Sequence, residues 1–367
     1  MPSRRDVLKL SGAATAGILM SASGVTLADS PKPKIKAAGY PHDRVQAIRD
    51  GKVGIDQAAV DFDVSNIYKM NDLAFGPKKA YDVTEIGLIP YITKYINDGF
   101  RGYTLIPIFI SRTFRHRNIY VHADSGIEKP EDLRGKRVGT PGYGSSANTW
   151  VRGMLNDQYG VAAKDMHWIE ATKSSDIKGA VSSSNGAGSR YELPNDFPLV
   201  SGPAGVDESD LLLNGECDAL ITPITPRAFT EGNPKIRQMF TDLKSAEQNY
   251  FRDTGLFPIM HAVAIRADVA RDMPGLPAAV FQMYSGAKQI AYENLATTTV
   301  LRTSLPWVTN EYDETRQLMG DDYWRYGIEA NRKELEAVMR YTFEQGLVKE
   351  HGRFEEMFHP GTLKLQG

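Results

Sequence analysis

The sequence predicts an α/β protein of two lobes, with helices at the C-terminal end of the chain packed on the first lobe. Segments with the patterns of strands and helices alternate through residues 35–121, and a second series of the same kind runs through residues 129–223. A strand pattern returns at residues 259–265 and is followed by helical stretches. The order strand, helix, strand is typical of a mainly parallel sheet covered by helices. We therefore expect two such sheets, with the chain crossing between them more than once.

The first series begins with a short strand that ends in a turn containing glycine and proline. Helical spacing of apolar residues then alternates with continuous apolar runs of strand length. The expected elements are a strand at 35–39, a helix at 42–50, a strand at 60–64, a helix at 66–75, a new unit opening at 81–85, an apolar aromatic segment at 86–96, and strands at 105–110 and 119–121.

The second series is expected to form the smaller sheet. Its elements are a helical turn at 129–135, a strand at 137–140, a loop at 141–146, a helix at 147–159, a strand at 166–170, a helix at 208–213 and a strand at 219–223. Residues 182–188 are rich in serine and glycine, which predicts an exposed loop.

Four helical stretches follow the returning strand, at 276–295, 310–319, 332–345 and 352–358. We expect them to cover the first lobe. The predicted division of the chain is a leader at 1–28, the first part of lobe 1 at 29–124, lobe 2 at 125–254, and the return to lobe 1 with the C-terminal helices at 255–367.

The first 28 residues have the pattern of an export signal. Residues 3–9 read Ser-Arg-Arg-Asp-Val-Leu-Lys, which resembles the twin-arginine signal, and no charged residue occurs from Leu10 to Leu27. Thr26 and Ala28 place small residues three and one positions before a cleavage site after Ala28. This run is too short and too mildly apolar for a spanning helix. We expect a periplasmic protein whose mature chain is not inserted in the membrane.

Composition excludes several classes of function. The chain has 43 Lys and Arg against 45 Asp and Glu, so it lacks the basic excess of a nucleic-acid-binding protein. Its single cysteine, Cys217, can form neither a disulfide framework nor a thiolate metal cluster. No His-Glu-x-x-His, Gly-x-Ser-x-Gly or phosphate-binding lysine motif occurs, and Gly142-Tyr143-Gly144 lacks the rest of a dinucleotide fingerprint. We therefore expect no metal and no cofactor.

Five tracts of the chain have distinctive sequences. They read Ile-Pro-Ile-Phe-Ile-Ser-Arg-Thr-Phe-Arg-His-Arg-Asn-Ile-Tyr-Val at 106–121, Glu-Asp-Leu-Arg-Gly-Lys-Arg-Val-Gly at 131–139 with Trp-Val-Arg-Gly at 150–153, Gly-Leu-Phe-Pro-Ile-Met-His at 255–261, and Leu-Met-Gly-Asp-Asp-Tyr-Trp at 318–324. Together they resemble the 4,5-dihydroxyphthalate decarboxylase family, from about residue 37 to about residue 358.

The resemblance implies the type II periplasmic solute-binding fold, in which two α/β lobes joined by crossover strands close on a ligand. Exported members of the family resemble the substrate-binding proteins of ABC transporters. The chain differs from the family's enzymes in its leader, and in the segment Gly-Tyr-Pro-His-Asp-Arg at 39–44, which inserts proline and histidine. Asp-Val-Thr-Glu-Ile at 82–86 also replaces the more usual pattern there.

Cationic side chains follow the apolar strand at 105–110. Arg112, Arg115 and His116 come directly after it, and ligands bind outside the carboxyl ends of strands in open α/β sheets. Arginine suits two-point recognition of a carboxylate, and histidine can add a donor or a proton. The alternative is a solvated loop with ordinary surface ion pairs. Arg117 is the member of this tract that we expect to be solvated.

The second group of candidates lies in the other lobe. The loop of residues 140–146 combines glycines and hydroxyls with the start of a helix, whose free amides favour an anion. Gly/Ser loops also precede many helices that bind nothing. Arg152 lies farther along the same helix. The candidates are Thr140, Tyr143, Ser145, Ser146 and Arg152.

Three further residues complete the predicted site. Glu85 is interpreted as a proton donor, an acceptor for a phenol, or an acid at a helix start. His261 lies in an apolar run, where it is either a site residue or a satisfied core histidine. Tyr40, like Tyr143, is placed on a loop that could line the cleft.

Two functions use these residues. In the first, the protein is a periplasmic receptor that captures a small, aromatic carboxylate for an inner-membrane permease. In the second, it is a cofactor-free decarboxylase of a dihydroxylated aromatic acid, in which His116, His261 or Glu85 protonates the ring carbon as carbon dioxide leaves. The export signal favours the receptor.

Overall fold

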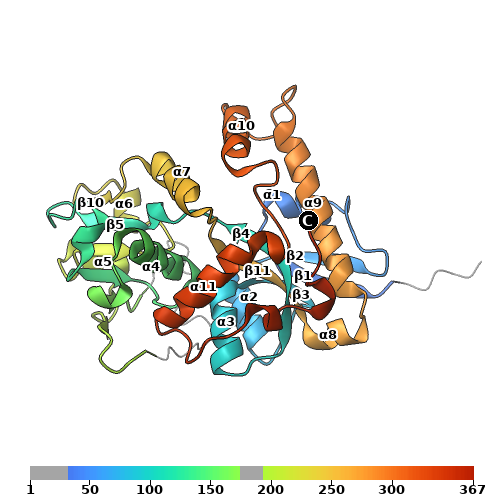
Figure 1. The fold of residues 1–367 in the computed structure, drawn as a ribbon, viewed down its shortest axis with the longest axis horizontal. Helices are drawn as coiled ribbons and strands as arrows, with labels where there is room; N and C mark the ends of the chain where they lie inside the picture. The colour runs from blue at the N-terminus through green and yellow to red at the C-terminus, as the bar shows by residue number, and fades with distance from the viewer. Residues whose placement is uncertain (1–31, 174–192) are drawn as a thin grey trace, which may run out of the picture. The chain divides into compact units, whose positions relative to one another are not determined.

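The computed structural model describes residues 32–173 and 193–367, which form two sheets with helices packed on them (Figure 1). The export signal predicted at 1–28 and the loop predicted at 182–188 lie outside the described residues. The boundaries predicted at 124/125 and 254/255 remain predictions. No helix within residues 32–173 or 193–367 has the length and apolarity needed to cross a bilayer.

The first sheet has the strand order β2-β1-β3-β11-β4. Its strands are β1 (Lys34–Gly39), β2 (Ala59–Val64), β3 (Val83–Gly87), β4 (Tyr103–Arg112) and β11 (Ile259–Arg266). β1 is parallel to both β2 and β3, whereas β11 runs antiparallel to both of its neighbours, β3 and β4. The expected parallel sheet is therefore interrupted by one reversed strand, which comes from the far end of the sequence.

The second sheet has the order β10-β5-β9-β6-β7-β8. Its strands are β5 (Ile119–His122), β6 (Arg137–Thr140), β7 (His167–Glu170), β8 (Leu199–Ser201), β9 (Ala219–Ile221) and β10 (Ile236–Gln238). Here β5 is the strand that runs antiparallel to its neighbours β9 and β10. The expectation of a smaller second sheet is wrong by strand number, because within residues 32–173 and 193–367 the second sheet has six strands and the first has five.

The chain crosses between the sheets twice. It leaves the first sheet after β4 and enters the second at β5, and it returns after β10 to β11. The strands at the two crossings, β5 and β11, are the reversed strands of the two sheets. The structure therefore has the predicted architecture, two α/β lobes joined by more than one crossing of the chain.

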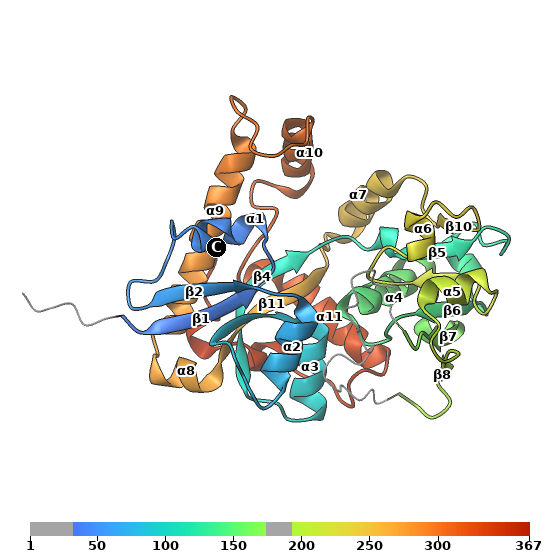
Figure 2. The same ribbon diagram turned by 180° about the vertical axis from the view of Figure 1, so that it is seen from behind.

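The helices pack around these sheets (Figure 2). They are α1 (Asp43–Arg49), α2 (Ile67–Phe75), α3 (Leu88–Asn97), α4 (Ser146–Tyr159), α5 (Glu208–Leu213), α6 (Arg227–Thr230), α7 (Leu243–Thr254), α8 (Ala267–Asp272), α9 (Leu276–Ala296), α10 (Val308–Met319) and α11 (Arg332–Glu344). The helix expected at 352–358 is instead a 3-10 turn at Phe354–Met357. Glycine at 352 and proline at 360 flank this segment, and both residues disfavour the continuation of a helix.

Local sequence explains where the best-defined helices begin and end. The Ser145 side chain accepts a hydrogen bond from the backbone N–H of Asn148 and caps α4, which ends at Gly160 with a φ of +64°. Asp242 caps α7 in the same way, and α7 ends at Gly255 with a φ of +65°. A side-chain acceptor at the start and a left-handed glycine at the end are the usual limits of a helix.

Of the C-terminal helices, α9 packs on a strand of the first sheet, α10 packs on α9 and α7, and α11 contacts helices of both lobes. α9 packs on α1 and β4, whereas α11 lies against both α3 and α4. Trp150 of α4 is buried and donates its indole N–H to the carbonyl of Ile259 in β11, over 2.8 Å. The two lobes therefore share buried contacts through α4.

Candidate functional site

A buried carboxylate lies at the carboxyl edge of the first sheet, where three strands meet. Glu85 belongs to β3, whose five residues are all buried, and its own exposed fraction is 1%. β1 lies beside β3 in parallel, so the residues after Gly39 reach the same edge. A Cβ on Gly39 would lie 3.3 Å from Oε2 of Glu85, and glycine therefore leaves the room that this carboxylate occupies.

Antiparallel pairing of β11 brings His261 to the same place. His261 lies opposite Gly87 of β3, and its Nδ1 is 2.6 Å from Oε1 of Glu85. Nε2 of His42, at the start of α1, lies 3.4 Å from the same oxygen. The backbone N–H of Tyr40 donates to Oε2 over 2.9 Å. We call Tyr40, His42, Glu85 and His261 the Glu85 cluster.

The Glu85 carboxylate is held in its ionised form. Burial by itself would raise its pKa, but the hydrogen bonds from His261 and His42 outweigh burial and hold the pKa of Glu85 well below its usual range. A carboxylate can only accept hydrogen bonds, so Nδ1 of His261 is the donor to it. Glu85 thus fixes the ring orientation and the tautomer of His261.

The proton of His42 can also be placed from geometry. Nη2 of Arg44 lies 3.1 Å from Nδ1 of His42, and a guanidinium can only donate. Nδ1 is therefore an acceptor, and the proton of the neutral ring lies on Nε2, which faces Glu85. Arg44 itself is held by the carbonyl of Ile110 and by the ring of Trp324, 3.9 Å from its guanidinium carbon.

His261 keeps a nitrogen available. Its side chain is 16% exposed, and its Nε2 makes no hydrogen bond to any residue in 32–173 or 193–367. The Tyr40 ring stacks beside the imidazole, with centroids 6.1 Å apart and planes 14° apart. The Tyr40 hydroxyl accepts a hydrogen bond from the backbone N–H of Ile67, which fixes the ring. The cluster therefore presents a positioned imidazole N beside an aromatic face.

Arg112 has a different environment from the one predicted for a ligand-binding cation. It is 4% exposed and forms an ion pair with Glu334 of α11, with Nη2 2.7 Å from Oε1. Its other N–H groups donate to Asn331 Oδ1 and to the carbonyls of Phe257 and Arg325. All five donors are used within the protein, so Arg112 joins α11 to β4 and has no donor left for a carboxylate.

His116 is also enclosed. It is 1% exposed, neither ring nitrogen has a hydrogen-bond partner, and the ring lies edge-on between Phe240 and Tyr250. Burial lowers the pKa of His116 to about 4, so the imidazole is neutral at pH 7. A neutral imidazole in an aromatic cage does not hold a carboxylate.

Arg115 is half-buried beside the residue that precedes His261. Its Nε lies 3.1 Å from Sδ of Met260, and Nη1 donates to Asn118. Burial, with repulsion from Arg117, lowers the pKa of Arg115 to about 10, which leaves it charged at pH 7. Its Nη2 makes no hydrogen bond within the described parts of the chain. The ligand role predicted for Arg115 remains a prediction.

The second group of predicted residues ties α4 to the first lobe. Ser146 Oγ accepts from the backbone N–H of Ile89 at the start of α3. Arg152 is 1% exposed and donates to Gln345 and to the carbonyl of Tyr143, whose ring it stacks on at 3.8 Å. Ser145 caps α4, and Thr140 accepts from the side chain of Asn148. Ser146 and Arg152 therefore bind parts of the chain outside the second lobe, whereas Thr140 and Ser145 bind within it.

The sequence analysis named Tyr40, Glu85 and His261 of this cluster and did not name His42 or Arg44. The signal was present in the turn at 39–44, where histidine and arginine stand two and four residues beyond Tyr40. Trp324 was missed as a site residue because it lies far along the chain, after α10.

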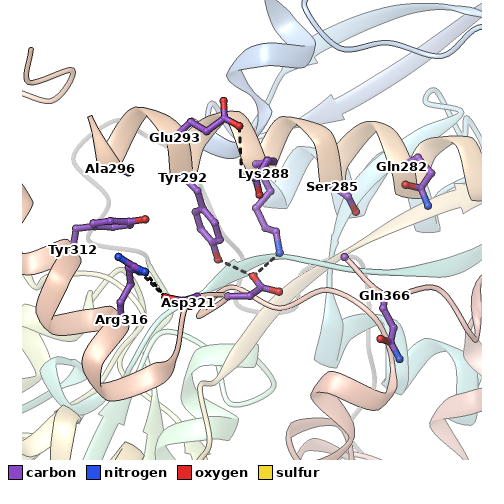
Figure 3. A pocket seen from close by; sticks show the side chains of 13 residues that line it. Gln282, Ser285, Lys288, Tyr292, Glu293, Ala296, Tyr312, Arg316, Asp321 and Gln366 are labelled. Carbon is purple, nitrogen blue, oxygen red and sulfur yellow. Dashed lines mark hydrogen bonds and ion pairs between the residues drawn. The ribbon is translucent and has the colours of Figure 1, made fainter. Parts of the chain in front are cut away.

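A polar cavity of about 550 Å³ lies between α9 and the segment after α10 (Figure 3). Figure 3 shows Lys288 and Tyr292 pointing from α9 toward this segment, where both side chains bind Oδ1 of Asp322, at 2.6 and 3.0 Å. Lys288 also donates to the carbonyl of Trp324, and the Tyr292 hydroxyl accepts from its backbone N–H. This network fixes Trp324, on which Arg44 stacks, and so supports the Glu85 cluster indirectly.

The chain is similar to proteins of known activity or structure. It is 33% identical to the 4,5-dihydroxyphthalate decarboxylase of Comamonas testosteroni over 333 residues, which cover 91% of this chain and 98% of that protein. It is 34% identical to the enzyme of the same name from Pseudomonas putida over 211 residues, 57% of this chain and 78% of that one.

Two further similarities concern the fold. Residues 110–186 match the family described as NMT1/THI5 like. The periplasmic sulfonate-binding protein SsuA of Methylobacillus flagellatus superposes with a TM-score of 0.50 at 12% identity, covering 90% of this chain and 92% of that one. This likeness supports the two-lobed binding-protein fold. By its similarity over almost the whole of a curated relative, the chain belongs to the 4,5-dihydroxyphthalate decarboxylase family.

Proposed function

We propose that the protein is an exported solute-binding protein that captures a small aromatic carboxylate at the Glu85 cluster and delivers it to an inner-membrane permease. The observation that carries this proposal is the imidazole of His261, oriented by Glu85, with its Nε2 left for a ligand. Nδ1 of this ring donates to Glu85, and with a proton on Nε2 as well the ring is a charge-assisted donor for a carboxylate. The stacked Tyr40 ring offers a face to an aromatic group.

A second candidate function is decarboxylation. It is favoured by the 2.6 Å hydrogen bond between Glu85 and His261, which is the arrangement of a proton donor held by a buried carboxylate. In this reaction the bond between the ring carbon and its carboxyl carbon breaks, and its electron pair stays on the ring carbon. That carbon takes the proton from Nε2 of His261, carbon dioxide leaves, and water returns the proton to the imidazole.

One experiment separates the two functions. The purified protein is screened by thermal shift against benzoate, phthalate, 4,5-dihydroxyphthalate and the aliphatic control succinate, and carbon dioxide release is measured for every hit. A ligand at 100 times its Kd stabilises the protein by about 2.7 kcal/mol. Stabilisation by aromatic acids without carbon dioxide release supports the receptor, and turnover supports the decarboxylase. Failure of every aromatic acid to bind would contradict both.

The site is tested with matched variants. We expect His261→Gln to weaken binding by about 10- to 150-fold, because a charge-assisted hydrogen bond contributes about 1.5 to 3 kcal/mol. His167→Gln makes the same replacement at an exposed histidine of β7 and should leave binding unchanged. Equal binding by the two variants would place the ligand elsewhere.

Export is tested separately. The double variant Arg4→Lys/Arg5→Lys should accumulate as a precursor in the cytoplasm, because lysine does not replace the arginine pair in a twin-arginine-type signal. Periplasmic maturation of this variant, followed by immunoblotting of cell fractions, would contradict the prediction. Its outcome is independent of whether the protein binds a carboxylate.

A further inference from the structure

Exposed apolar side chains gather in the connection between α9 and α10. We call residues 297–307 the tip. Val300, Leu301, Leu305 and Trp307 are 65%, 46%, 48% and 68% exposed. In the rest of the described chain, large exposed apolar side chains occur singly, as at Val64, Val200 and Phe343. Isolated exposed apolar residues are normal on a protein surface, but a group of them marks an interaction surface.

The tip carries a positive charge and no negative one. Between Glu293 and Glu311 the sequence contains no acidic residue, and Arg302 is its only charged side chain. The remaining residues of the tip are mostly threonine and serine. The chain as a whole has a formal net charge of -2, so an acid-free cationic stretch with exposed leucine, valine and tryptophan is locally distinct. Such a stretch is suited to an apolar surface that carries negative charge.

The position of the tip leaves it accessible. Figures 1 and 2 both show the connection at the end of α9 that lies away from the first sheet, with α10 beside it. α9 has 21 residues, which corresponds to a length of about 30 Å. The tip is therefore a projecting loop between two helices rather than a flat face.

We propose that the tip inserts into the interfacial layer of a bilayer that contains anionic phospholipid. Tryptophan is favoured at the boundary between headgroups and acyl chains, where its ring is buried and its N–H stays hydrated. Leu301 and Leu305 supply apolar side chains for the acyl region, and Arg302 pairs with a lipid phosphate. The threonine and serine hydroxyls stay among hydrated headgroups. Contact of this kind is peripheral and requires no spanning helix.

A second copy of the chain fits the tip less well than a lipid surface. In a two-fold contact the same surface meets itself, so Arg302 would face Arg302 among apolar side chains of a stretch that contains no acidic residue of its own. A projecting loop also has little area for a flat contact. An anionic bilayer offers both an apolar layer and negative charge, and it deforms around the tip.

The test uses purified protein and unilamellar vesicles of phosphatidylethanolamine and phosphatidylglycerol, with phosphatidylcholine vesicles for comparison. We expect cosedimentation with the anionic vesicles and a blue shift of tryptophan emission. The triple variant Leu301→Ser/Leu305→Ser/Trp307→Ser should partition at least about tenfold less, because most of the buried apolar area is removed. Val200→Ser, at an exposed valine in β8, is the matched control and should bind as the parent protein does.

Two variants separate the contributions within the tip. Arg302→Gln should weaken binding to anionic vesicles about fivefold and leave binding to phosphatidylcholine unchanged. Trp307→Phe should retain most of the binding but lose the blue shift, because Trp150, Trp168 and Trp324 are much less exposed. An unchanged melting temperature of the triple variant shows that its fold is intact, since the replaced side chains are exposed.

Residues 1–31 are the same in all of these proteins, so a difference between variants arises at the tip. Equal vesicle binding by the parent protein and the triple variant would overturn the proposal, as would failure of the parent to bind anionic vesicles. Light scattering that shows a dimer of the parent and a monomer of the triple variant, without lipid binding, would assign the tip to a second copy and also overturn it.

Discussion

Two buried ionic centres of the first lobe differ in what they leave available. In the first, Arg112 and Glu334 are 4% and 1% exposed, and every N–H of the guanidinium has a protein acceptor. In the second, Glu85 is just as buried, but the imidazoles of His42 and His261 that bind it are 18% and 16% exposed. The first centre is closed, and the second has an imidazole nitrogen at its boundary.

The difference shows that burial of a charge alone does not identify a binding site. Both centres contain a residue of a strand in the same sheet, Glu85 of β3 and Arg112 of β4. Both also contain a carboxylate with a cationic or ionisable partner. The two centres differ in whether every N–H donor already has an acceptor within the protein. A satisfied buried pair has a structural role, whereas a buried carboxylate that orients a partly exposed histidine is typical of binding and catalytic sites.

The largest loss of stability is expected when the buried ion pair of Arg112 and Glu334 is broken. Arg112→Ala should lower the free energy of unfolding by about 3 to 5 kcal/mol, because Glu334 would be left buried without its partner. Ligand affinity of the protein that remains folded should stay within about twofold. Urea unfolding and titration calorimetry measure the two quantities.

The double variant Arg112→Met/Glu334→Leu is the control for this prediction. It removes both charges and should recover much of the lost stability, because no unpaired charge stays buried. If Arg112→Ala instead unfolds like the parent protein but no longer binds an aromatic acid, Arg112 is a ligand group and the distinction between the two centres is wrong.

Glu85→Gln tests the open centre. An amide is uncharged and has one acceptor oxygen in place of two, so it holds the His261 ring less firmly than the carboxylate does. We expect a 10- to 150-fold loss of affinity for an aromatic acid, corresponding to about 1.5 to 3 kcal/mol. The stability contribution of Glu85 should depend on pH, because its pKa is lowered in the folded protein. It is fully present above a pH of about 4.3, the value for an unfolded chain, and is lost as the pH falls through the folded pKa.

Urea unfolding between pH 3 and pH 6 measures this dependence, and the stability of Glu85→Gln should fall less steeply on acidification than that of the parent protein. Equal slopes for the two proteins, together with unchanged affinity, would show that Glu85 is an ordinary buried acid.

His116 provides a third environment, a buried histidine with no carboxylate beside it. Its pKa is lowered to about 4 by burial, so the unfolded chain takes up its proton first as the pH falls. The stability that depends on a neutral His116 is therefore complete above a pH of about 6.5 and is lost as the pH falls toward 4. At pH 5 the loss amounts to roughly 2 kcal/mol.

His116→Phe should abolish this part of the acid sensitivity and leave binding at pH 7.5 unchanged. Unfolding free energies at pH 7.5 and pH 5 measure the effect. If the variant lost affinity for an aromatic acid at pH 7.5 while remaining folded, the enclosed histidine would belong to the site after all.

The smallest loss of stability is expected when a hydrogen bond between the two lobes is removed. Ser146→Ala removes the acceptor of the Ile89 N–H and should lower stability by about 0.5 to 1.5 kcal/mol. Affinity should change by less than about threefold, because this bond lies outside the Glu85 cluster. A larger loss of affinity than of stability would show that the contact of α4 with α3 controls the site.

Most of the fold was predictable because its central strands are continuous apolar runs and its main helices have apolar spacing. The elements that escaped prediction have little pattern to detect. β8 and β10 have three residues each, and α7 buries only Tyr250 among its twelve residues. The insertion of β11 between β3 and β4 was also beyond local patterns, because it depends on pairing between distant parts of the chain.

The candidate site was predictable to the extent that strand ends carry function. Whereas His261 was named as a histidine within an apolar run, that rule selected Arg112 and Glu85. It could not separate them, because the partner that closes Arg112 is Glu334, 222 residues away in the sequence. His42 was noted only as a difference from the family's sequence pattern. A histidine directly after the turn that ends β1 can nevertheless reach the edge of the sheet where Glu85 lies.

The place of β11 in the first sheet has a consequence for how the chain folds. β3 and β4 are synthesised long before residues 259–266. Until that strand arrives, β3 lacks a neighbour on one side and β4 has no neighbour in the described sheet. Pairings between distant segments form slowly, and an unpaired apolar strand is open to association with other chains. Since the same late strand carries His261, a nascent chain can acquire its Glu85–His261 pair only in the step that closes the sheet. A ligand that recognises this pair would therefore distinguish chains that have completed folding from those that have not.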